Sequence, residues 1–173
     1  MKKYIFTVLI FYIFTACSKN ENGEAFNFVA GQSFYLLDKD GNDRLNPQSE
    51  MAINAKKIRI YYLVDGERME AIEYLHMMAP NAILDNPYGF GIGAPSPISN
   101  RSYYSIDVGL NCKGNDGDIL YTYIEWDEND TDTIRSEIYR KNSVLKSTIV
   151  AFNDSVWTPN QLENRTIFTI IKP

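Results

Sequence analysis

Acidic and amide side chains alternate in one short segment of the chain, between Asp38 and Asn46. Clustered carboxylate and carbonyl oxygens are the ligands that Ca²⁺ takes in proteins, and an EF-hand loop places its first three ligands at alternate positions. The candidate ligands are Asp38, Asp40, Asn42 and Asp43. Two positions depart from an EF-hand, because Asp43 stands where that loop has glycine and Ser49 stands where it has glutamate. Since Asp, Asn and Gly are also common turn residues, the sequence favours a solvated turn, with calcium as the alternative.

A second group of carboxylates lies further along the chain, at Glu125, Asp127, Glu128, Asp130 and Asp132. Two carboxylates can hydrolyse a glycosidic bond, and Trp126 would serve beside them as a platform for a sugar ring. A glycosidase needs its carboxylates on either side of the bond, however, and all five of these fall around one predicted turn. We therefore interpret this corner as a solvated hairpin tip.

The chain has one histidine, His76, and no nucleophile or base stands near it in a recognisable pattern. A lone histidine is usually structural. We therefore predict that the protein is not an enzyme, with a small hydrolase as the weaker alternative. Two cysteines and one histidine are too few ligands for a zinc finger or an iron–sulfur cluster. A pI near 4.9 argues against a nucleic-acid partner, because a nucleic-acid binder needs a basic face.

Residues 86–100 hold three glycines and three prolines in fifteen positions, which predicts a long loop without a regular strand. Tyr88 and Phe90 lie in this loop, together with Ile92. Aromatic side chains on an exposed loop can stack on sugars or contact a protein partner, so Tyr88, Phe90 and Trp126 are the candidate binding residues. The alternative is that the loop aromatics fold back over one end of the domain.

The first residues of the chain predict its compartment. A short basic start is followed by the uncharged apolar run of residues 4–14 and by Thr15-Ala16-Cys17. This order is that of a secretory signal, and the apolar run is too short for a membrane-spanning helix. The segment resembles the bacterial lipobox, which implies that residues 1–16 are removed and that Cys17 is lipidated. The alternative is an ordinary cleaved signal in which Cys17 is incidental.

Removal of that signal takes away Lys2 and Lys3, so the formal charge changes from −5 to −7. An acidic domain gains nothing from an anionic membrane surface, and the lipid would have to hold the protein there. Residues 18–24 are polar, so residues 17–25 are predicted to be the lipidated cysteine and a flexible tether. Residues 26–173 would then form a single domain. Cys112 would have no partner for a disulfide, and we interpret it as structural.

Runs of β-branched and aromatic residues, bounded by Gly, Asn, Asp or Pro, make up most of the remaining sequence. Residues 57–64 are the clearest strand, and Asp65-Gly66 after them predicts a hairpin with a return strand over 68–75. A helix over 67–78 is the alternative there. Further strands are predicted at 33–37, 81–84, 102–110, 119–126, 132–140, 143–152 and 166–172.

This spacing predicts an all-β fold, an antiparallel β-sandwich of about eight or nine strands. The inward positions of the alternating runs predict its core. The predicted core residues are Ile58, Ile60, Tyr62, Val64, Ile106, Val108, Leu120, Ile124, Trp126, Ile134, Ile138, Ile149, Phe168 and Ile170.

Four stretches carry a family resemblance: residues 34–47, 58–66, 123–140 and 167–172. They resemble a group of small Bacteroidota lipoproteins of uncertain role. The resemblance implies an immunoglobulin-like domain on a lipid anchor in the outer membrane, at the periplasmic face or the cell surface. Thr133 and Ser155 resemble the acceptors of Bacteroidota O-glycosylation, since each follows Asp and precedes an apolar residue. We therefore expect a non-catalytic module that binds a glycan or an envelope protein, with a structural envelope component as the alternative.

Overall fold

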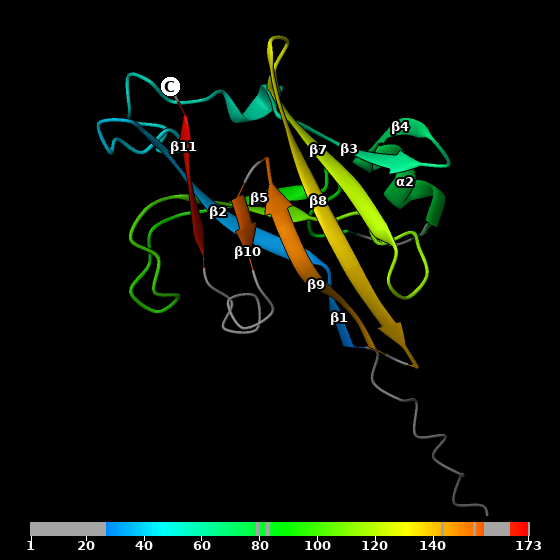
Figure 1. The fold of residues 1–173 in the computed structure, drawn as a ribbon. Helices are drawn as coiled ribbons and strands as arrows, with labels where there is room; N and C mark the ends of the chain where they lie inside the picture. Colours follow the sequence, from blue (N-terminus) through cyan, green and yellow to red (C-terminus); the bar gives the residue numbers. More distant parts are fainter. Residues whose placement is uncertain are drawn as a thin grey trace, which may run out of the picture.

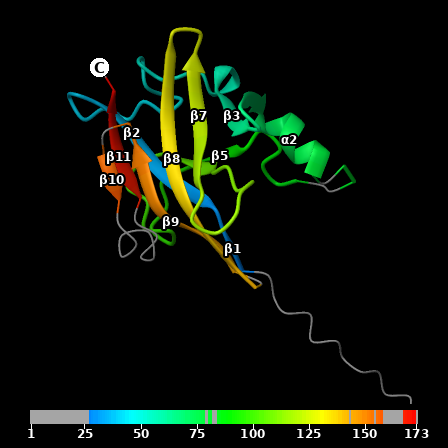
Figure 2. The same cartoon turned by 45° about the vertical axis from the view of Figure 1, so that its right-hand side comes forward.

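A computed structural model of the protein describes residues 27–78, 80–81, 84–142, 144–153, 155–157 and 167–172. These residues form two β-sheets in separate layers, with β2 passing behind β8 and β9 (Figures 1 and 2). The strands are β1 (Asn27–Val29), β2 (Gly31–Asp38), β3 (Arg59–Val64), β4 (Glu67–Glu70), β5 (Phe90–Gly93), β6 (Ser105–Gly109), β7 (Ile119–Asp127), β8 (Asp130–Lys141), β9 (Val144–Phe152), β10 (Ser155–Trp157) and β11 (Phe168–Lys172). The helices are the short 3-10 turn η1 (Ala55–Lys57) and α2 (Ala71–Met78).

The predicted all-β sandwich is confirmed. Among the described residues, one sheet has seven strands in the order β1-β9-β8-β7-β3-β4, with β10 added to β9, and the other has the order β11-β2-β6-β5. Most pairings are antiparallel, but β1 is parallel to β9 and β11 is parallel to β2. The number of strands exceeds the eight or nine expected, because β1, β5 and β10 were not predicted. Each of these three strands is only three or four residues long. Such short strands carry little alternation in the sequence.

The two sheets pack on one hydrophobic core, whose residues alternate along each strand as the period of two requires. Most of the predicted core is buried, including Ile60 and Ile124 at 0% exposure. Leu120 and Ile149 are only half-buried. Ile149 is on the outer face because a bulge in β9 places Ser147 opposite Ile138 but Ile149 opposite Glu137. The extra residue reverses the alternation, which the sequence pattern could not reveal.

The hairpin at Asp65-Gly66 is confirmed, with both residues at positive φ (53° and 89°) as a two-residue turn requires. The return strand predicted over 68–75 is wrong beyond Glu70, where α2 begins. The helix forms because Ala71 and Tyr74 fall on one helical face, and both are buried. Tyr74 packs edge-on against Tyr62 of β3, with ring centroids 5.4 Å apart. In the strand predicted over 81–84, residues 82–83 lie outside the described residues.

The loop predicted over residues 86–100 is also corrected, because β5 lies inside it and pairs with β6. The glycines, which led to the prediction of a loop, allow neighbouring groups to approach β5 closely. A Cβ atom on Gly91 would lie 2.8 Å from Oδ1 of Asn86, so a larger residue there would require the Asn86 side chain to move.

Candidate functional site

An open groove of about 670 Å³ lies where β5 of the four-stranded sheet faces the turn η1 and the strands β3 and β4 of the larger sheet. One wall consists of Tyr88, Phe90 and Ile92, and the other includes Ile58, Arg59 and Glu70. Tyr88 and Ile92 are 56% and 37% exposed, whereas Phe90 packs against the core and Ile58 is buried. The structure thus brings together Tyr88 and Phe90, two of the three predicted binding residues. We call this feature the β5 groove.

The polar side of the β5 groove is held by Arg59. Its Nε lies 3.5 Å from Oε1 of Glu70, and its Nη1 donates to the carbonyl oxygens of Lys56 (2.8 Å) and Ile58 (2.9 Å). Both members of the ion pair are partly exposed, so the pair adds little stability. Its effect is to fix a cation and a carboxylate beside an aromatic surface, an arrangement that can orient a ligand.

The prediction that Trp126, the third candidate binding residue, is an exposed platform is wrong. Its side chain is 1% exposed and forms part of the core, because Thr122, Ile124 and Trp126 share the inward face of β7. Its Nε1 donates to Oδ2 of Asp132 at 2.7 Å. The ring is therefore closed to any external ligand.

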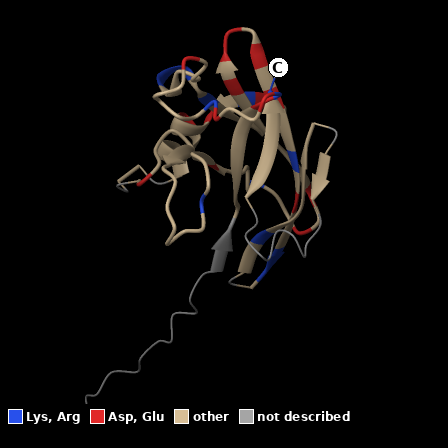
Figure 3. Ribbon diagram, turned by 90° about the vertical axis from the view of Figure 1, so that its left-hand side faces the viewer, with Lys and Arg blue, Asp and Glu red and all other residues tan. Residues whose placement is uncertain are grey.

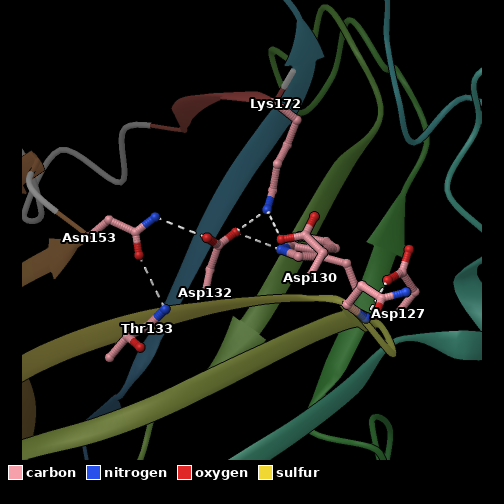
Figure 4. Close-up of polar contacts among 8 residues, drawn as sticks. Asp127, Asp130, Asp132, Thr133, Asn153 and Lys172 are labelled. Carbon is pink, nitrogen blue, oxygen red and sulfur yellow. Dashed lines mark hydrogen bonds and ion pairs between the residues drawn. The ribbon is translucent and has the colours of Figure 1, made fainter.

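The acidic corner forms the tip of the β7–β8 hairpin, beside the C-terminal end of β11 (Figure 3). The interpretation as a wholly solvated tip is wrong for Asp132, which is 7% exposed. Nζ of Lys172 lies 2.6 Å from Oδ2 of Asp132 and 2.5 Å from Oδ1 of Asp130 (Figure 4). Asn153 donates through Nδ2 to the other oxygen of Asp132 at 2.9 Å. These contacts join the two sheets, and they occupy the two carboxylates with structural partners.

The calcium candidates lie in the turn after β2. Oδ1 of Asp38 accepts from the backbone N–H groups of Asp40 (2.9 Å) and Asn42 (2.8 Å), and Oδ2 accepts from Nδ2 of Asn42 (2.9 Å). The side-chain hydrogen bond from Asn42 is the main reason that the pKa of Asp38 is lowered. Asp43 turns away instead, and its Oδ2 accepts from the N–H of Tyr104 at 2.8 Å. No three His, Cys, Asp or Glu side chains gather as a metal site in the described part of the chain.

We expect calcium to leave the melting temperature of the protein unchanged, because backbone donors already satisfy the carboxylates of Asp38 and Asp43. A bound ion at a hundredfold excess over its Kd would stabilise the native state by about 2.7 kcal/mol. Melting curves in excess calcium and in excess chelator should therefore superimpose. A calcium-dependent rise that Asp40→Asn abolishes would show that the turn is a metal site.

A smaller cavity of about 220 Å³ lies beside α2 and is lined in part by Tyr62, Tyr74 and Cys112. Burial raises the pKa of the Cys112 thiol. A raised pKa disfavours the thiolate, which is the reactive form of cysteine. Burial raises the pKa of Tyr62 as well, and its hydroxyl donates to the carbonyl oxygen of Gly109 at 3.2 Å. His76 is exposed on α2.

The modification candidates lie in different settings. Thr133 is half-buried within β8, where its backbone N–H donates to Oδ1 of Asn153 at 3.3 Å (Figure 4). Ser155 is exposed at the start of β10. O-glycosylation of either residue stays a prediction. Cys17 lies outside the described residues, so its lipidation stays a prediction too.

No protein-family model, no curated protein and no solved structure matches this chain. Of the helices in the described ranges, none is both long enough and apolar enough to cross a membrane.

Proposed function

We propose that the protein is a lipid-anchored lipoprotein of the bacterial outer membrane, an immunoglobulin-like module that binds a glycan or an envelope protein without catalysis. The observation that carries this proposal is the β5 groove, in which Tyr88 stands 56% exposed beside the fixed cation of Arg59. Specific sites are concave and largely apolar, with a few well-placed polar groups. The groove has this composition, and a purely structural envelope component would need no such feature.

The side chains of the groove support binding over hydrolysis. The described residues that line the groove include no serine or cysteine nucleophile and no histidine base. The charged residues of the groove are Lys56, Arg59 and Glu70. A hydrolase needs a nucleophile and a base, two carboxylates or a bound metal, and Glu70 is the one carboxylate among the described lining residues. The groove is equipped to hold a ligand through an aromatic surface and an ion pair.

The proposed anchor accords with the direction of the strands. The tether of residues 17–25 would lead directly into β1, at the lower end of the molecule in Figure 1. β2 leads away from this end, and β11 runs parallel to it. The tip of the β7–β8 hairpin, which contacts β11 through Lys172, therefore lies at the end away from the anchor. Lipid chains contribute about 0.8 kcal/mol for each buried CH₂, so two or three of them hold such a domain firmly.

We expect Tyr88→Ala to weaken the binding of any ligand in the β5 groove by at least about tenfold, because exposed tyrosines in grooves are frequent binding hot spots. The protein would be tested on a glycan array and in pull-downs from envelope extracts. Tyr103→Ala is the matched control, since Tyr103 is 38% exposed and packs on Tyr35, away from the groove. Ligands that bind wild type and Tyr88→Ala equally would count against the groove as the binding site.

A further inference from the structure

Strand β5 lies at the outer edge of the four-stranded sheet, where β6 alone among the described strands pairs with it. The backbone N–H of Gly109 donates to the carbonyl oxygen of Gly89 at 2.8 Å, in the same register as the pairs that follow. In an antiparallel pair, alternate residues direct their N–H and C=O groups toward the partner strand. Gly91 and Gly93 therefore bond to β6, and the N–H and C=O groups of Phe90 and Ile92 point away from it.

This free edge borders the β5 groove, because the side chains of Phe90 and Ile92 line it. The edge thus offers two backbone donors and two acceptors in a row, next to an apolar surface. An extended polypeptide carries donors and acceptors at the same repeat, and edge strands recruit such segments as an added strand. A sugar or a lipid has no matching repeat.

We propose that β5 binds an extended peptide segment of a partner protein, which joins the four-stranded sheet as a fifth strand and fills the β5 groove. This inference rests on the proposed binding function and names the class of its ligand. Alternate side chains of the added strand enter the groove and contact Tyr88 and Ile92. The peptide therefore has apolar residues at every second position.

The charges around the groove define the peptide further. Lys56 and Arg59 line the groove and Lys57 is the next residue of η1, whereas Glu70 is the one acidic residue among the described lining residues. This local positive charge contrasts with the formal charge of −5 for the whole chain. An acidic residue in the peptide, placed near Lys56, complements it.

The other edge strand on this side of the molecule differs in composition. β4 carries Glu67, Arg68 and Glu70 in four residues, and charged side chains are the usual protection of an edge against pairing. β5 has no charged residue, and its sequence alternates Phe90 and Ile92 with glycine. The edge without charged side chains is therefore that of β5.

The test is a selection of twelve-residue random peptides displayed on phage, with the protein from residue 17 onward as the target. The enriched peptides should alternate apolar residues and include an acidic one, and Ile92→Pro should weaken their binding at least tenfold. Proline removes the outward N–H of Ile92 and leaves the bonds of Gly91 and Gly93 to β6 in place. Ile92→Val is the matched control, since it retains that N–H and should bind like wild type.

Amide hydrogen exchange supplies a readout that needs no substitution. In the free protein the amides of Phe90 and Ile92 should exchange fast, and a selected peptide should slow both at least tenfold. Failure to enrich any peptide, unchanged exchange at these amides, or pairing of β5 with a second copy of the chain would overturn the inference. A glycan that binds wild type and Ile92→Pro equally, but Tyr88→Ala weakly, would overturn it and leave the proposed binding function standing.

Discussion

Lys172→Met is expected to lower the free energy of unfolding by about 3 kcal/mol, because it leaves a buried carboxylate without its cation. The side chains of Lys172 and Asp132 are each 10% exposed, and their charged atoms lie 2.6 Å apart. Breaking a buried pair costs about 3–5 kcal/mol. The lower end applies here, since Asp132 keeps its hydrogen bonds from Trp126 and Asn153. Urea denaturation followed by circular dichroism measures the change.

Lys113→Met is the matched control for this experiment. Lys113 pairs with Asp65 at 2.5 Å, but the two side chains are 40% and 81% exposed. Surface pairs contribute about 0–1 kcal/mol, so the control should be nearly neutral. Adding Asp132→Asn to Lys172→Met should recover part of the loss, because it removes the unpaired charge. Equal costs for Lys172→Met and Lys113→Met would show that the pair is not effectively buried.

Cys17→Ala is expected to move the protein from the membrane fraction to the soluble fraction, or to leave its signal uncleaved. In this proposal the lipid on Cys17 attaches the protein, and an acidic domain has no electrostatic attraction to an anionic membrane. Metabolic labelling with palmitate and fractionation of the cells would measure the change. Cys112→Ala is the control, because a half-buried structural thiol should not affect attachment. Palmitate label that survives Cys17→Ala would refute the anchor.

The fold could be predicted where a strand is long and one of its faces is buried. β3 and β7 show this, since their period of two is visible in the sequence and places Ile60 and Ile124 in the core. The prediction failed where contacts with another strand of the same chain determine the local structure. Residues 71–78 form a helix because Tyr74 packs on Tyr62. β5 is a strand because β6 pairs with it in spite of its glycines.

The site could be predicted less completely than the fold. The aromatic residues Tyr88 and Phe90 were recognisable from a loop rich in proline and glycine. Lys172 was missed because nothing near it in sequence suggests an acidic partner, and only the packing of the two sheets places it beside Asp132. The burial of Trp126 was already implied by the alternation of β7, which also placed it in the predicted core. The free edge of β5 follows from the order of strands, which a single sequence does not encode in any local pattern.

The pairing of β11 with β2 also bears on when the protein can fold. Phe168 pairs with Phe34, so about 130 residues of chain separate the two strands. Contacts between such distant segments form slowly, because a long loop must close before they contribute any stability. Until β11 has been synthesised, Phe34 lacks one of its two partner strands and Asp132 lacks Lys172. A nascent chain therefore stays incompletely folded until β11 has emerged from the ribosome.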